Sequence, residues 1–321
     1  MHTSVDPSLA VRDRALVAVA RTRALGMHFY GHFLGIGAPG GAGERLVLDP
    51  QTSPGTGCAG SPGELASLAD LAMGSAVRSA LGAGLRLGTT SLSLHHLREP
   101  APGRLTATAR VLWSTGDPGD GHTHCTVEDS GGQPVLAAHG WFVVLPSPDG
   151  RVLAPLPWES DADVALPVLV PDDLDAQERE AVAEVQSLET QARARTCSVA
   201  ALLTEPRALE EREDGALCGV VPVTRAVGNR VGHVQGGALY GIAAAAAEAV
   251  MGPEWALSDG YAQYLRPADG REMGVQARSL RRGRRAGFTE VTLSVREKAV
   301  VTARFTHRPA AASGIRMPEG S

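Results

Sequence analysis

Apolar residues recur at helical spacing along two stretches of the first half of the chain. The first stretch covers residues 8–25, and Gly26 follows it as a plausible stop. The second covers residues 64–81 and begins just after Ser61 and Pro62. Serine is a good N-cap, and proline suits the first helical position because the N–H that it lacks would have no partner there. The pattern therefore predicts two helices, one with a defined end and one with a defined start.

Short apolar runs bounded by turn residues predict strands in both halves of the chain. In the first half the predicted strands cover residues 45–48, 89–97, 103–113, 124–128 and 135–145. In the second half they cover residues 217–223, 260–265, 274–280, 289–295 and 300–306. In each half most of these runs follow a long helix, which predicts a helix and then a meander of strands.

The same order of elements occurs twice, which predicts an internal repeat. A charged, helix-favouring stretch at residues 174–194 is the counterpart of the first helix. An alanine-rich stretch at residues 238–250 is the counterpart of the second. The strand sequence LTATARVL at residues 105–112 also parallels MGVQARSL at residues 273–280.

The repeat predicts two domains of ordinary size joined by a surface linker. The region before the second helix-favouring stretch is rich in Pro and Asp, which is typical of a linker. The predicted organisation is an N-terminal domain over residues 1–148, a linker over 149–173, a C-terminal domain over 174–308 and a disordered tail over 309–321.

A glycine-rich loop leads into the alanine-rich helix of the second half, with the sequence GNRVGHVQGGALYG at residues 228–241. Gly236 and Gly237 lie where the loop becomes the helix, and glycine lets a ligand approach the backbone because it has no Cβ. The first N–H groups of a helix lack internal partners, and the helix dipole adds positive charge there. Such a helix start can stabilise a carbonyl oxygen that becomes negative during a reaction. Asn229 and Gln235 add side-chain amides nearby, so all four residues are candidate catalytic residues.

This pattern resembles the PaaI-type hotdog-fold thioesterases. The shared residues run N-x-x-G-H-V-Q-G-G-A-L from Asn229 and are followed by a strand that ends in QYLRP at residues 263–267. The family usually reads N-x-x-G-x-x-H-G-G, so Gln235 replaces the usual His. The resemblance covers about residues 25–148 and 195–308. It implies an α+β double hotdog, in which two antiparallel sheets are each wrapped round a central helix as a pseudo-dimer within one chain.

The resemblance also implies where the catalytic acid lies. The family carries an acid about two turns after the glycines, but that position in the second half is Ala244. Aligning the first half puts residues 61–63 (Ser-Pro-Gly) on the H-G-G and Asp70 on the acid. Pro62 has no N–H that could polarise a carbonyl group. The resemblance therefore implies one composite site, with Asp70 facing the glycine-rich loop of the other half.

Each of these candidates has a structural alternative. Asp70 could be a solvated helix residue, Asn229 could cap a turn, and Gln235 could cap the helix that follows it. Glu248 lies about one turn beyond the expected acid position and could replace the acid, although a surface or buried structural role is favoured.

Two further groups are expected to bind the substrate. Thr89 and Thr90 lie on the strand after the Asp70 helix, where family members place a hydroxyl that orients water. Five arginines form a basic cluster in the second half: Arg278, Arg281, Arg282, Arg284 and Arg285. Arginine grips phosphate oxygens with two parallel hydrogen bonds, and the family places a turn of this type near the nucleotide of coenzyme A. A solvated hairpin is the alternative for the arginines, and an ordinary strand hydroxyl is the alternative for the threonines.

Composition narrows the class of partner. The net charge of -5 gives no global case for nucleic acid, and no aromatic residues are interleaved with the arginines. The four cysteines are scattered, which favours buried thiols in a reducing cytoplasm. No apolar run resembles a signal peptide or is long enough to cross a bilayer. The histidines show no metal-ligand spacing. We therefore expect a cytoplasmic protein with neither a nucleic-acid nor a membrane partner.

The sequence predicts an acyl-CoA thioesterase that acts on an acyl-CoA or carrier-bound acyl thioester. Asp70 would activate water or attack the substrate through an anhydride, and the residues leave both routes open. Coenzyme A is expected only as part of the substrate, with no other cofactor, and a homodimer of double hotdogs is a possible assembly. Two alternatives stay open: a non-catalytic acyl-CoA binding protein, and a hotdog lyase or isomerase of a biosynthetic pathway.

Overall fold

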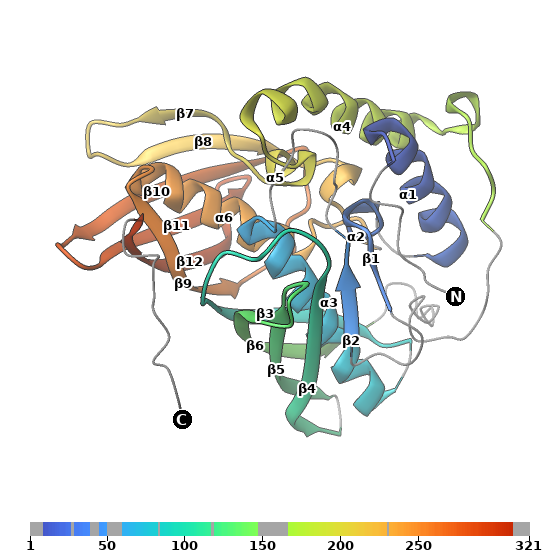
Figure 1. Cartoon of the computed structure of the whole chain (residues 1–321), viewed down its shortest axis with the longest axis horizontal. Helices are drawn as coiled ribbons and strands as arrows, with labels where there is room; N and C mark the ends of the chain where they lie inside the picture. The colour runs from blue at the N-terminus through green and yellow to red at the C-terminus, as the bar shows by residue number, and fades with distance from the viewer. Residues whose placement is uncertain are drawn as a thin grey trace.

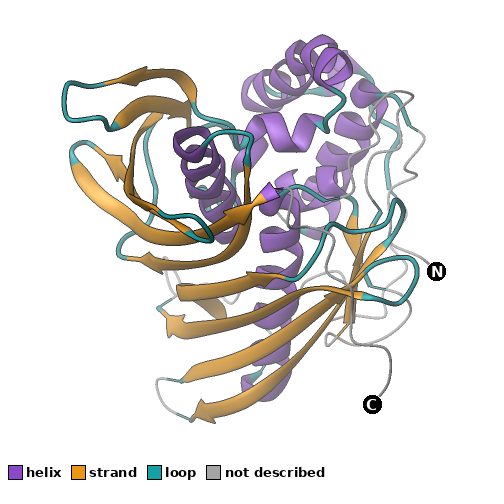
Figure 2. Ribbon diagram, turned by 60° about the vertical axis from the view of Figure 1, so that its left-hand side comes forward, coloured by secondary structure: helices purple, strands orange, loops and turns teal. Residues whose placement is uncertain are grey.

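An antiparallel sheet of 12 strands dominates the computed structural model of the chain. The structure describes residues 9–26, 29–38, 45–49, 60–82, 84–116, 119–146, 166–229 and 231–310. The sheet curves around two long helices, α3 (Pro62–Leu81) and α6 (Gly236–Met251), which contact each other (Figure 1, Figure 2). Among the described residues, no helix is long and apolar enough to span a membrane.

The other elements follow the chain in two similar series. In the first half they are α1 (Val11–Leu25), α2 (Phe29–Leu34), β1 (Ile36–Gly37), β2 (Arg45–Leu48), β3 (Arg86–His96), β4 (Leu105–Thr115), β5 (Asp120–Glu128) and β6 (Pro134–Leu145). In the second half they are the 3-10 helix η2 (Pro171–Asp173), α4 (Ala176–Arg195), α5 (Val199–Leu203), β7 (Arg207–Glu211), β8 (Leu217–Pro222), the 3-10 helix η3 (Arg225–Val227), β9 (Trp255–Tyr264), β10 (Glu272–Arg282), β11 (Gly287–Val295) and β12 (Lys298–Pro309).

The strands of the two halves are arranged in the same order when each half is read from its edge of the sheet to the middle. The strands follow one another as β1-β2-β4-β5-β6-β3-β9-β12-β11-β10-β8-β7. Strands β3 and β9, which each follow a central helix, meet in the middle through antiparallel pairs from Ser91–Gln263 to His95–Asp259. The expectation of two separate sheets is therefore corrected in one respect. These two strands bond to each other and make the sheet continuous.

Local sequence signals set several helix ends as predicted. Helix α1 ends at Gly26, which has a φ of 63° and occupies the left-handed region where glycine is favoured. Helix α3 begins after Ser61 with a reciprocal capping box, in which Ser61 and Glu64 each accept a backbone N–H of the other. Satisfying these N–H groups within the chain fixes where the helix starts.

Six elements of the described structure were not predicted: α2, α5, β1, β7, η2 and η3. In α2 (Phe29–Leu34) the aromatic side chains Phe29 and Phe33 stack with ring centres 5.7 Å apart. These short elements carry weak local signals. Packing against the rest of the fold, and not helix or strand propensity, stabilises them. Strand β9 also starts five residues before the predicted Gly260, since its first residues pair with β12.

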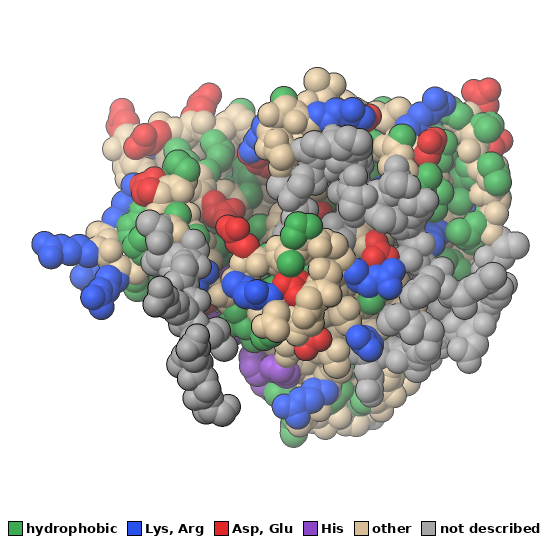
Figure 3. Space-filling view, viewed as in Figure 1, with side chains coloured by type: hydrophobic (Ala, Val, Ile, Leu, Met, Phe, Trp, Pro, Cys, Tyr) green, Lys and Arg blue, Asp and Glu red, His purple; other side chains and the backbone are tan. Residues whose placement is uncertain are grey.

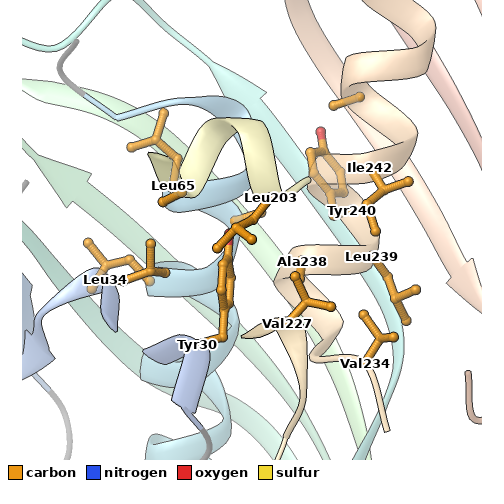
Figure 4. Close-up of a cluster of buried hydrophobic side chains, with 14 of the residues drawn as sticks. Tyr30, Leu34, Leu65, Leu203, Val227, Val234, Ala238, Leu239, Tyr240 and Ile242 are labelled. Carbon is orange, nitrogen blue, oxygen red and sulfur yellow. The ribbon is translucent and has the colours of Figure 1, made fainter. Parts of the chain in front are cut away.

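The two central helices approach each other closely because glycines line their contact. A Cβ on Gly241 of α6 would lie 2.5 Å from the Cα of Gly63 of α3. A Cβ on Gly237 would lie 2.3 Å from the Cα of Ser67. The two helices run in opposite directions at this contact, and their N-terminal halves lie side by side. Figure 4 shows that the core beside this crossing draws side chains from both halves, including Leu65 and Ile242.

The predicted domain boundaries fall partly outside the described residues. Residues 147–165, which include most of the predicted linker, are outside them, as are residues 311–321 of the predicted tail. The two N-terminal helices of the halves, α1 and α4, contact each other, and Arg23 forms a salt bridge of 2.5 Å with Glu178 (Figure 1).

Candidate active site

Asp70 lies on α3 with only 6% of its surface exposed, and both carboxylate oxygens accept hydrogen bonds. Oδ1 accepts from the hydroxyl of Thr89 on β3 at 2.9 Å. Oδ2 accepts from the side-chain amide of Gln235 at 2.7 Å. The backbone N–H of Gly237 donates to the same carboxylate. The structure thus brings together residues from both halves around one buried acid.

Gln235 is fixed in one orientation by its neighbours. Its Oε1 accepts from the backbone N–H of Ala238 at 2.8 Å, so Gln235 is the N-cap of α6. Ser67 donates its hydroxyl to the same oxygen at 3.1 Å. Because the Ala238 N–H can only donate, the carbonyl oxygen of the amide must face the helix and the NH₂ group must face Asp70. The capping role and the contact with Asp70 are therefore both present in one side chain.

Gly236 forms the first turn of α6 beside the Asp70 carboxylate. A Cβ at this position would lie 2.8 Å from Asp70 Oδ2 and 3.2 Å from Thr89 Oγ1, so only glycine fits. Tyr264 at the end of β9 donates to the Gly236 carbonyl oxygen at 2.8 Å and holds this peptide in place. None of the described residues accepts a hydrogen bond from the Gly236 N–H. This N–H therefore stays available for a ligand at the positive end of the helix.

A cavity of about 380 Å³ opens at these residues. Asp70, Thr89, Gln235 and Gly236 line it. Residues of α3, β3 and β6 line part of the cavity, and its apolar walls include Leu71, Leu87, Phe142 and Leu145. The loop before α6 and the residues that follow β9 also line it. This size and mixture of apolar walls with a few polar groups are typical of a small-molecule site.

Burial raises the pKa of Asp70 to about 6. The hydrogen bonds from Thr89 and Gly237 and the positive charge of Arg78 oppose this shift, but they do not cancel it. A carboxyl group with such a pKa changes protonation state close to neutral pH, which suits a group that accepts and returns a proton.

The pH dependence of any reaction at this site should report the ionisation of Asp70. Asp70 acts as a base only when ionised, so kcat/KM should fall with decreasing pH below about 6 and stay level above it. His233 lines the same cavity, and burial lowers its pKa from the usual value. An unchanged profile for His233→Gln would assign the break to Asp70. A break near pH 4, the value of a solvated Asp, would contradict the burial argument.

Asn229 and Thr90 line the cavity, but their oxygen atoms are engaged with backbone. Asn229 Oδ1 accepts from the N–H groups of Val231 and His233, each at 3.0 Å, and so shapes the glycine-rich loop. The hydroxyl of Thr90 donates to the Trp141 carbonyl oxygen at 3.0 Å, at a bulge in β3. Among the described hydrogen bonds neither residue is a partner of Asp70, and those of Asn229 are of the turn-capping kind.

The five clustered arginines lie at the end of β10 and in the turn to β11, away from the cavity. The blue side chains at the far left of Figure 3 lie at this end of the molecule. Arg278 pairs with Glu290 at 2.7 Å, and Arg282 donates to the Val250 carbonyl oxygen. Of the arginines that the structure describes, Arg78, Arg86 and Arg266 line the cavity.

The counterpart site lacks both the acid and the helix-start N–H. Its expected acid position, Ala244, is fully buried, and Pro62 stands where Gly236 stands in α6. Glu248 lies more than three turns along α6 from Gly236 and does not line the cavity. Burial raises its pKa to about 7. Within the described part of the chain, no group of three or more His, Cys, Asp or Glu side chains could hold a metal ion.

Two family models match the chain, one in each half. The model of the acyl-CoA thioesterase N-terminal domain matches residues 224–308, and that of the thioesterase superfamily matches residues 61–117. A comparison with curated proteins found no match.

Solved structures extend the likeness over most of the chain. A putative thioesterase II from Thermobifida fusca is 15% identical, covers 88% of this chain and 98% of its own, and has a TM-score of 0.51. The tesB protein of Mycobacterium avium subs paratuberculosis is 14% identical, with coverage of 86% and 96% and a TM-score of 0.50. A conserved protein with a hot dog fold from Alicyclobacillus acidocaldarius is 12% identical, with coverage of 88% and 98% and a TM-score of 0.50. The chain has the hotdog fold. At these identities, the likeness to solved structures concerns the fold.

Sequence reasoning missed several residues that this hotdog chain places at the site. Ser67 lies three residues before Asp70 in an otherwise apolar helix segment, and that spacing puts both side chains on one face. Spacing alone could therefore have revealed it. Tyr264 belonged to the quoted motif, but its contact with Gly236 depends on how β9 lies against α6. The cavity arginines carried no local signal, because they come from three separate elements or loops.

Proposed function

We propose that the protein hydrolyses acyl thioesters carried by coenzyme A or by a carrier protein. The supporting observation is a buried carboxylate paired with a helix N-terminus in one cavity. Asp70, with a pKa of about 6, is suited to take a proton from water near neutral pH. Gly236 lines the same cavity, and its N–H can donate a hydrogen bond to a carbonyl oxygen that becomes negative during the reaction.

In the proposed reaction, water attacks the carbonyl carbon of the thioester while Asp70 takes a proton from that water. The carbonyl oxygen becomes negative and is stabilised by the Gly236 N–H and the dipole of α6. Loss of one such donor typically costs about 3–4 kcal/mol. The C–S bond then breaks, and the proton on Asp70 passes to the leaving thiolate, which restores the carboxylate.

We favour water activation over direct attack by Asp70. Hydrogen bonds from Thr89 and Gln235 hold the carboxylate in place, and its raised pKa of about 6 suits it as a base near neutral pH. Single turnover in ¹⁸O-labelled water should put the label only in the released acid. Label found in Asp70 of the recovered protein would instead support an anhydride intermediate.

We further propose a double hotdog with one working site whose loop pattern is of the PaaI type. The palindromic strand order and the separate thioesterase matches in the two halves support the tandem arrangement. The contact of Asp70 with Gln235, across 165 positions of sequence, supports a site shared by the halves. The lack of an acid at Ala244 and of an N–H at Pro62 supports a single site.

The test is a panel of acyl-CoA thioesters with detection of the released thiol. Release that depends on Asp70 for at least one acyl group is the expected result. Tight binding of an acyl-CoA without thiol release from any member of the panel would favour the non-catalytic binding protein.

The cavity arginines offer a direct comparison with the arginine cluster. We expect Arg86→Gln with Arg266→Gln to raise KM for a CoA thioester more than for the matching pantetheine thioester, because only the former carries the nucleotide phosphates. The pair Arg282→Ala with Arg284→Ala, remote from the cavity, should affect both substrates equally. A selective loss in the second pair would assign the nucleotide to the cluster at the turn between β10 and β11.

A further inference from the structure

One peptide group of α6 joins the side chains of Tyr264 and Asp70. The hydroxyl of Tyr264, at the end of β9, donates to the carbonyl oxygen of Gly236 at 2.8 Å. The N–H at the other end of that peptide belongs to Gly237, and it donates to the Asp70 carboxylate. Resonance couples the two ends of a peptide group. A hydroxyl of β9 is thus connected to the acid of α3 through a single polarisable unit.

Close packing holds this peptide in place. A Cβ on Gly236 would lie 2.8 Å from Asp70 Oδ2, and a Cβ on Gly237 would lie 2.3 Å from the Cα of Ser67. Both distances are too short for a side chain, so the peptide lies directly against α3. It has little room to turn away from Asp70, and Tyr264 holds its other end.

Tyr264 keeps its proton over the pH range in which Asp70 ionises. Burial raises the pKa of Tyr264 well above its usual value, and the negative charge of Asp70 raises it further. A neutral phenol has one hydrogen to donate, and the bond to Gly236 uses it. Tyr264 is therefore a fixed donor to this peptide and is poorly suited to give its proton to a leaving thiolate.

We propose that Tyr264 is a positioning residue that strengthens the hydrogen bond from the Gly237 N–H to Asp70 by polarising the peptide between them. The inference rests on the proposed function only for the role of Asp70 as a base. A hydrogen bond to a carbonyl oxygen draws electrons from the N–H at the other end of the peptide and makes that N–H a stronger donor. A stronger donor stabilises the ionised carboxylate, which is the form that takes a proton from water.

Other charged and titratable groups also surround Asp70. Those that line the cavity from the neighbouring elements and loops are Arg78 of α3, Arg86 of β3, His233 of the loop before α6 and Arg266 after β9. The residues of β6 that line it are apolar. Tyr264→Phe changes no charge among these groups. A change in the pKa of Asp70 in this variant therefore reports hydrogen bonding and access of water.

The test measures the pKa of Asp70 by ¹³C NMR of the carboxyl carbons over a pH titration, with Asp70→Asn to assign the signal. Tyr264→Phe keeps the ring and removes only the hydroxyl. In this variant the pKa of Asp70 should rise from about 6 by about 0.1–0.7 unit. Tyr261→Phe is the matched control, because Tyr261 lies on the same strand with 45% of its surface exposed, and it should leave this pKa unchanged.

The sign of the shift separates polarisation from space filling. If Tyr264 only filled space, its truncation would admit water, and the pKa of Asp70 would fall toward that of a solvated carboxyl group. A fall, or no rise beyond that in Tyr261→Phe, would overturn the inference. Incorporation of 3-fluorotyrosine at position 264 tests the same point in a chain that keeps the hydroxyl. This stronger donor should lower the pKa of Asp70, and an unchanged pKa would contradict the coupling.

Kinetics provide a second readout that also separates the inference from the proposed function. The break in the pH profile of kcat/KM should move to higher pH in Tyr264→Phe, while KM well above the break changes little. A raised KM at every pH with an unmoved break would make Tyr264 a substrate contact and overturn the inference. An NMR shift without thiol release from any thioester would support the coupling and overturn the proposed function, and thiol release without the shift would do the reverse.

Discussion

Replacing Asp70 by Asn should lower kcat by about 10²–10⁴-fold while substrate binding survives. Asn keeps the size of the side chain and can accept from Gln235 through its carbonyl oxygen while its NH₂ group donates to the Thr89 hydroxyl. The amide cannot take a proton from water, so only the chemical step is lost. The measurement is kcat for one active thioester, together with the affinity for a non-hydrolysable analogue.

Glu248→Gln is the control for this prediction. Glu248 is also a partly buried acid on a central helix, but it does not line the cavity, so turnover should change little. If Glu248→Gln is inactive while Asp70→Asn stays active, Asp70 is not the catalytic acid, and the acid lies in the other half. Binding of two analogue molecules per chain would contradict a single site.

Asp70→Asn should also raise the stability of the folded chain at neutral pH. The pKa of Asp70 is raised in the folded chain, so between about pH 4 and 6 the native state holds a proton that the unfolded state has lost, and stability falls as pH rises through this window. Asp70→Asn removes the cost of a buried charge, which is on the order of 1–3 kcal/mol. Unfolding midpoints at pH 8 and pH 4 should therefore differ less in the variant than in the parent chain.

Gly241→Ala should destabilise the fold and impair turnover, although no described hydrogen bond joins Gly241 to Asp70. The new methyl group would lie 2.5 Å from the Cα of Gly63, a backbone atom that cannot rotate away. Overpacking of this kind costs about 1–3 kcal/mol, which exceeds the gain of up to about 1 kcal/mol in helix propensity. Separating α3 from α6 would also draw Asp70 away from Gln235.

Gly116→Ala is the matched control, because an added Cβ there would meet nothing within 4 Å. Denaturant unfolding should show a lower midpoint for Gly241→Ala and little change for Gly116→Ala. Equal midpoints for the two variants would show that the helix contact tolerates more separation than the glycines indicate.

Much of the secondary structure was predictable because its signals are local. Ser61, Glu64 and Gly26 fix helix ends through contacts within a few residues of chain, and short apolar runs bounded by turn residues predicted most of the strands. The two candidate halves of the site were also visible as patterns, one around Asp70 and one around Gly236. The repeat of elements required only that the two series be compared.

The sequence by itself determined which residues could serve as an acid, a helix start and a cap, because these are properties of residue type and near neighbours. Tertiary structure decided how they are used. The hydrogen bond from Gln235 to Asp70 joins residues that are 165 positions apart in the sequence. The burial that raises the pKa of Asp70 comes from both halves. The same folding left the arginine cluster on a distant turn and placed Arg78 in the cavity. Distances and burial depend on the packing of α3 against α6 and on the pairing of β3 with β9, and no local pattern encodes either contact.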